Sequence, residues 1–154
     1  SNHLKDDPRF HFVIIGKGQH KEKLQSLAGN NVSFLPLLDK AQVPSILKKF
    51  NVCFIGLKNQ QLFRFGISPN KIFEYMYAAK PIIQSIKAGN NPVEEANAGF
   101  SVEPENAEEI KKAIFNAFQM PREDLESLGR NGYEYGLENH SFEKLTERLI
   151  STFD

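Results

Sequence analysis

The residues with the clearest chemical potential are Lys71 and Glu74, which lie three positions apart just after Ser68 and Pro69. Serine followed by proline is a strong helix start, because serine can cap free amides and proline gives up an amide that would otherwise stay unpaired. We therefore expect a helix that Ser68 caps, with Pro69 as its first residue, and that runs to about Ala79. The first turn of a helix presents unpaired amides and positive charge, so this position is ready to bind an anion.

Lys71 falls in that first turn, where the helix dipole disfavours a cation. An anion bound there would remove the conflict, because it would take charge from the helix end and from the ammonium together. Glu74 shares the face of Lys71, and its carboxylate could accept hydrogen bonds from two adjacent hydroxyls, such as those of a ribose. The alternative is a surface Lys–Glu pair worth a few tenths of a kcal/mol. Spacing alone leaves both interpretations open.

Short apolar runs and helical patterns alternate around this segment. Strands are predicted over residues 10–15, 32–35, 52–57, 81–85 and 100–102. Helices are predicted over residues 21–28 and 93–97, and from Asp39, Asn106, Pro121 and Ser141 onward, with the glycines at 129, 132 and 136 weakening the helix that Pro121 begins. This alternation is typical of an α/β fold, a Rossmann-like doubly wound parallel sheet with helices on both faces.

Ligands of such sheets bind outside the carboxyl ends of the strands, which gives three loops a place in a candidate site. The first is Gly16-Lys17-Gly18, the second is Leu37-Leu38-Asp39, and the third is the long loop that ends at Ser68-Pro69. The two glycines by themselves more often mark a tight turn.

Composition excludes several classes of protein. The chain has 154 residues, and 19 Lys plus Arg balance 19 Asp plus Glu, so no long-range positive field attracts nucleic acid. One compact domain is expected at this length. The single cysteine, Cys53, lies in an apolar run and is expected to be buried and inert. No apolar stretch approaches the length of a membrane span, and the four histidines show no metal-ligand spacing.

The segment from Gly66 to Met76, with Lys80-Pro81-Ile82-Ile83 after it, resembles the donor-site signature of retaining GT-B glycosyltransferases. It is most similar to those that build capsule and O-antigen polysaccharides. The segments 12–18, 32–35 and 99–105 resemble further parts of the same domain, so the resemblance covers nearly the whole chain.

The resemblance implies a donor site for a nucleotide-diphosphate sugar, with UDP as the expected nucleotide. Glu74 would bind the ribose hydroxyls, and the first turn formed by Ser68, Pro69, Asn70 and Lys71 would lie by the diphosphate. The loop after Leu35, including Leu37, would hold the base through backbone groups. Gly16 and Gly18 would match the first glycine loop of the family.

Two departures from the family pattern affect this assignment. Many relatives carry a glutamate eight positions before the ribose glutamate, near the donor sugar, and Gly66 stands at that position here. Contacts to the donor sugar therefore do not carry over, although Lys71 and Arg64 are polar side chains nearby. The chain also begins after the place where relatives have this domain's first strand and helix, a basic pair for the phosphates, and the N-terminal acceptor domain.

We therefore interpret residues 1–154 as the nucleotide-sugar-binding C-terminal domain of a retaining glycosyltransferase, inactive by itself. Its partners would be the nucleotide-sugar donor, the N-terminal domain and a polysaccharide or lipid-linked acceptor. No cofactor or metal is expected, because amides and basic side chains would hold the phosphates. We expect a cytoplasmic location, with contact to the inner membrane face through the N-terminal domain left open.

Two other interpretations stay open at this point. A sugar-nucleotide epimerase of the same architecture also binds its nucleotide between two such domains. A flavodoxin-like binding module would leave Lys71 and Glu74 as a surface pair only.

The last predicted helix carries an apolar stripe of Phe142, Leu145, Leu149 and Ile150. In the resembling family the terminal helix tends to cross back to the N-terminal domain, so the stripe would stay open here. The alternative is that the stripe closes over this domain's own core.

Overall fold

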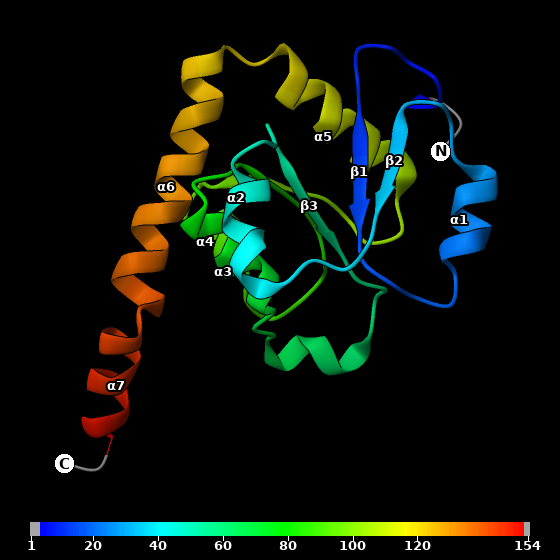
Figure 1. Cartoon of the computed structure of the whole chain (residues 1–154). Coiled ribbons are helices and arrows are strands. Elements are labelled where there is room, and N and C mark those ends of the chain that lie inside the picture. The colour runs from blue at the N-terminus through cyan, green and yellow to red at the C-terminus, as the bar shows by residue number, and fades with distance from the viewer. Residues whose placement is uncertain (1–3, 153–154) are drawn as a thin grey trace. The chain divides into compact units, whose positions relative to one another are not determined.

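The computed structural model describes residues 4–152, and the chain divides into two compact units, Ser1–Val43 and Pro44–Asp154 (Figure 1). Both are built from parallel strands and helices, and the fold class is the expected α/β, Rossmann-like one with helices on both sides of the strands. Among the described residues, strand pairing falls into two separate sheets, which explains the division.

The first unit is a parallel β–α–β motif. Strand β1 (Phe12–Ile15) pairs with β2 (Val32–Leu35) in a register that places Ile15 beside Leu35, and α1 (Lys21–Leu27) connects them. All three elements lie within two residues of the predicted ranges. The apolar composition of both strands and the glycine-rich segments that bound them explain this agreement.

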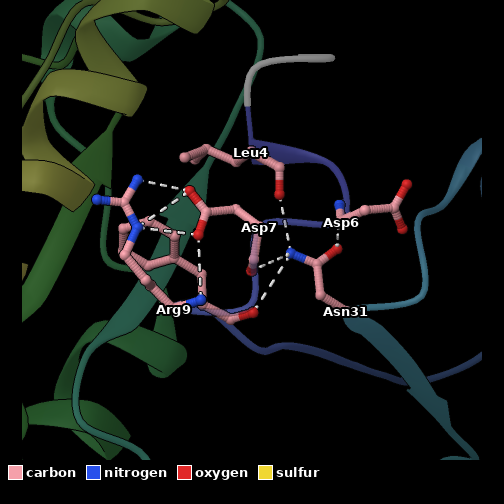
Figure 2. Close-up of polar contacts among 6 residues, drawn as sticks. Leu4, Asp6, Asp7, Arg9 and Asn31 are labelled. Atoms are coloured by element: carbon pink, nitrogen blue, oxygen red, sulfur yellow. Dashed lines mark hydrogen bonds and ion pairs between the residues drawn. The ribbon is translucent and has the colours of Figure 1, made fainter.

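The side chain of Asn31 organises the segment before β1 (Figure 2). Its amide nitrogen donates to the carbonyl of Leu4 at 2.8 Å and to those of Asp7 and Phe10 at 3.3 Å, and its oxygen accepts from the Asp6 amide at 3.1 Å. These bonds pair backbone groups that lie outside the strands. Polar backbone groups that are shielded from water need such partners.

The second unit contains a parallel three-stranded sheet in the order β3 (Cys53–Gly56), β4 (Ile82–Ser85) and β5 (Gly99–Ser101). Its core is a cluster of buried apolar side chains from the sheet and from helices around it. The helices from the boundary onward are α2 (Val43–Leu47), α3 (Asn70–Tyr77), α4 (Pro92–Glu95), α5 (Ala107–Gln119), α6 (Arg122–His140) and α7 (Phe142–Ile150). Within residues 4–152 no helix combines the length and apolar character that crossing a membrane needs.

Helix α3 is fixed by packing on both sides. Its Ile72 and Met76 are fully buried in the core, and α3 contacts β3 and β4. Helix α6, orange in Figure 1, packs along α3. The first residues of α3 are therefore held at the carboxyl edge of the sheet, where the loop from β3 arrives.

The glycines of α6 do not interrupt the helix, and they allow close packing. The helix runs unbroken through Gly129, Gly132 and Gly136, and all three are buried. A Cβ at Gly129 would overlap the carbonyl oxygen of Ala79, and one at Gly132 would lie 3.0 Å from the Cβ of Ala98. The glycines lie toward the elements that α6 packs against, so close approach offsets their low helix propensity.

The apolar stripe of α7 is open to solvent in the described structure. Leu145 is 45% exposed, Leu149 61% and Ile150 58%; the side chain of Phe142 lies outside the described part. Ser141 caps the helix as predicted, because its hydroxyl accepts from the Lys144 amide at 3.3 Å. The stripe therefore does not close over the core of the second unit.

The glycines of α6 allow a matched test of this packing. We expect Gly129→Ala to lower the free energy of unfolding by about 1–3 kcal/mol, because the new methyl meets a backbone carbonyl that cannot move aside. Gly136→Ala should be neutral or stabilise the protein by up to about 1 kcal/mol, because its Cβ would lie 3.7 Å from Met76, an ordinary contact, and alanine favours the helix. Denaturant unfolding measures both; equal effects of the two substitutions would contradict the close approach at Gly129.

Candidate functional site

The candidate site centres on the first turn of α3, which begins one residue later than predicted. Pro69 occupies the N-cap position with φ −71° and ψ 121°, and Asn70 is the first helical residue. The expectation that Ser68 caps the helix is wrong: Ser68 precedes the cap, and α3 has no side-chain cap hydrogen bond. The extended backbone of Pro69 causes the shift, since proline is compatible with either position.

This start leaves backbone donors free. The Ile72 amide donates to the Pro69 carbonyl at 3.0 Å, while the amides of Asn70 and Lys71 have no acceptor among the described residues. Helices α1, α5, α6 and α7 each carry a glutamate in the first turn, but α3 carries no acidic residue there. The positive end of α3 is thus uncompensated, and it carries Lys71 in addition.

Lys71 and Glu74 do not form the surface pair that spacing alone allowed. Both side chains are exposed, and neither takes part in an ion pair or side-chain hydrogen bond within the described structure. The ammonium and the carboxylate are therefore both available to a ligand at this helix end.

The backbone before α3 adopts a conformation that suits glycine alone. Gly66 has φ +96° and ψ 160°, a region in which side chains are strained. The position at which many relatives carry a glutamate thus serves backbone geometry here. Before it lies a 3₁₀ helix over Gln61–Phe65, which the sequence analysis treated as loop; the guanidinium of Arg64 lies 4.6 Å from the ring centroid of Phe65.

Asn90 is a polar residue of this site that sequence reasoning missed. Its side-chain oxygen accepts from the Ile67 amide at 2.8 Å, and its side-chain nitrogen donates to the Ile67 carbonyl at 2.9 Å. The signal available was an asparagine after a glycine in a loop at the carboxyl end of a predicted strand, where ligand sites of such sheets lie.

The remaining predicted residues belong to the first unit. Gly16 follows β1 with φ +139° and donates its amide to the Leu35 carbonyl at 3.3 Å. A Cβ at either Gly16 or Gly18 would meet open space. Leu37 follows β2 and is 63% exposed. Because β1 and β2 are parallel, the glycine loop and the Leu37 loop leave the same edge of their sheet.

A groove of the second unit lies apart from the predicted site residues. A groove of about 400 Å³ lies along β5 and α5, lined by residues such as Ser101, Lys112 and Asn116, and it includes none of the predicted site residues. No group of three or more potential metal ligands occurs among residues that the structure describes.

Comparison with known proteins now assigns the family. The family described as glycosyl transferases group 1 matches residues 2–119, which include every strand and the helices from α1 to α5. The chain therefore belongs to this family. No curated protein matches the chain. The glycosyltransferase family favours sugar transfer over the epimerase and the flavodoxin-like module.

Cys53 lies in the apolar surroundings that the sequence predicts for it. The residue is buried, and burial raises the pKa of its thiol to about 12, with only a small opposing effect from the charge of Lys80. The thiolate is the reactive form of cysteine, so the folded protein holds essentially none of it at neutral pH.

Labelling with a thiol reagent such as 5,5′-dithiobis(2-nitrobenzoate) tests this assignment. We expect one thiol to react rapidly in denaturant and to react in buffer only as fast as the protein opens. Raising the pH from about 7 to about 9 should not produce rapid labelling of the folded protein, since the folded-state pKa lies above that range. Fast labelling of the folded chain at neutral pH would show that Cys53 is accessible and ionised.

Proposed function

We propose that this chain binds the donor of a retaining glycosyltransferase, a nucleotide-diphosphate sugar with UDP as the nucleotide. The acceptor is a growing polysaccharide or a lipid-linked saccharide, such as those of capsule and O-antigen synthesis. The observation that carries the proposal is the start of α3 in a chain of a glycosyltransferase family. Two amides, a lysine and a glutamate follow one another there, and none of them has a partner within the described residues.

The chemistry assigned to this site is stabilisation of the leaving group. As the bond to the sugar breaks, negative charge grows on the departing diphosphate. The amides of Asn70 and Lys71, the positive end of α3 and the ammonium of Lys71 all favour that charge. In this proposal they take the part that a divalent metal has in other transferases, so the reaction needs no metal or other cofactor.

In this proposal, groups other than the α3 amides and Lys71 bind the nucleoside. The carboxylate of Glu74 accepts hydrogen bonds from the two ribose hydroxyls, a charged pairing that is stronger than a neutral one. Backbone groups of the loop that contains Leu37 hold the base, and the glycine loop of Gly16 and Gly18 lets a ligand approach the backbone closely.

Strand order supports the inference that this chain holds all but the first strand of its domain. The doubly wound sheet has the order 3-2-1-4-5-6. Without strand 1, the order leaves a pair, 3-2, and a triplet, 4-5-6. The pair β2-β1 and the triplet β3-β4-β5 reproduce that pattern. We infer that preceding residues supply this strand, its helix and the N-terminal acceptor domain.

The proposed location is the cytoplasm. Its support is chemical: Cys53 is a free, buried thiol, which suits a reducing compartment. Contact with the inner face of the membrane would come from the N-terminal domain.

Replacing Glu74 tests the ribose contact. We expect Glu74→Ala to weaken UDP binding by about 1.5–3 kcal/mol, roughly ten- to a hundredfold, because hydrogen bonds to a charged group are lost. Isothermal titration calorimetry measures the dissociation constant. Glu134→Ala, which removes an exposed carboxylate of α6, is the matched control and should leave binding unchanged.

Removing one ribose hydroxyl from the ligand tests the same contact from the other side. Wild-type protein should bind 2′-deoxy-UDP more weakly than UDP, and Glu74→Ala should lose that preference. If the variant discriminates between the two ligands as well as the wild type does, Glu74 does not bind the ribose.

The proposed division of the active site predicts no turnover by this chain. We expect the purified 154-residue protein to bind UDP but to release none from a UDP-sugar, with or without a saccharide acceptor, because the acceptor site and part of the phosphate site lie in preceding residues. A coupled assay for free UDP measures this. Catalytic release of UDP that disappears in Glu74→Ala would show that the described residues already form a complete active site.

A further inference from the structure

We propose that Asn90, on the loop after β4, is a positioning residue that sets the backbone leading into the donor-binding turn of α3. The inference rests on the proposed function for its ligand, but its geometry is independent of that function. Asn90 engages both backbone groups of Ile67, at 2.8 and 2.9 Å. A side-chain amide used in this way replaces the two bonds that a neighbouring strand would make.

The two hydrogen bonds to Ile67 act close to the start of α3. Ile67 lies two residues before Pro69, the N-cap of α3, and its side chain packs against the core cluster. With the side chain held by the core and both backbone groups held by Asn90, the chain has little freedom between Ile67 and the helix start. The direction of the Asn70 and Lys71 amides follows from that restraint.

Two glycines make the approach of Asn90 possible. A Cβ at Gly66 would lie 3.2 Å from the side-chain oxygen of Asn90, and Gly66 also needs its positive φ. A Cβ at Gly89 would overlap the carbonyl oxygen of Arg64, while the Gly89 amide donates to the Phe63 carbonyl at 2.9 Å. The loops after β3 and β4 are thus joined by three hydrogen bonds among the four residues Phe63, Ile67, Gly89 and Asn90.

The loop that carries Asn90 is itself anchored to the sheet through Asn91. The buried Gln84 of β4 donates to the Asn91 side-chain oxygen at 2.8 Å, and the Asn91 side-chain nitrogen donates to the Ser101 hydroxyl at 2.8 Å. Asn91 also caps α4, since its oxygen accepts from the Glu94 amide at 3.2 Å. The side chains of two adjacent asparagines therefore link the buried Gln84 of the sheet to Ile67, two residues before the N-cap of α3.

The test compares two variants that release the loop with one that does not. Asn90→Ala removes both bonds to Ile67, and Gly89→Ala pushes the loop away from Arg64. Asn131→Ala is the control, because it removes a side-chain amide that donates to the Asn97 carbonyl at 3.1 Å, at the other end of α4. UDP affinity is measured by calorimetry and stability by denaturant unfolding, under conditions in which every variant is folded.

We expect Asn90→Ala and Gly89→Ala each to weaken UDP binding about tenfold, the size expected for two neutral hydrogen bonds, and Asn131→Ala to change it less than twofold. Nuclear magnetic resonance spectra should show shifted amide signals of Asn70 and Lys71 in the first two variants and unshifted ones in the control. Wild-type affinity in a folded Asn90→Ala protein would overturn the inference.

The resonances separate this inference from the proposed function. If wild-type protein binds no UDP, the proposed function fails, and the amide signals alone decide the positioning role. Signals of Asn70 and Lys71 that stay in place in Asn90→Ala show that Asn90 does not set the start of α3; shifted signals show that it does.

Discussion

A helix end whose positive charge has no partner among residues 4–152 dominates the chemistry of the second unit. The amides of Asn70 and Lys71 and the ammonium of Lys71 lie together at the start of α3, with no acidic residue in that turn. Such an arrangement is unfavourable until an anion binds. The remainder of the second unit holds this turn in place: Ile72 and Met76 bury one side of the helix, and α6 approaches closely along its glycines.

The positive charge at the start of α3 also explains which side chains around it are charged and which are neutral. Glu74 lies outside the first turn, far enough along α3 to accept hydrogen bonds without neutralising the helix end. Asn90 supplies an uncharged side chain next to the incoming loop, so it fixes the backbone without competing for the anion. In the proposed function, a diphosphate joined to a ribose matches this order of groups, and the chain belongs to the glycosyl transferases group 1 family.

Local sequence patterns predicted most helices and strands, but not the contacts between residues that are distant in the sequence. The strands were predictable because buried parallel strands are short apolar runs bounded by glycine and proline. The start of α3 was misplaced by one residue, since a Ser-Pro pair does not determine whether proline is the cap or the first helical residue. The close packing of the α6 glycines and the contact between Asn90 and Ile67 were not predicted, because both depend on partners more than twenty residues away. The division into two units depends on strand pairing, which composition does not encode.

Titration of the isotope-labelled chain with UDP, followed by amide resonances, tests the central claim most directly. The account predicts saturable shifts that are largest at Asn70 and Lys71, since their free amides would donate to the diphosphate, with further changes around Glu74. Saturable shifts confined to other residues, such as Ser101 and Lys112 of the groove along β5, with Asn70 and Lys71 unchanged, would contradict it.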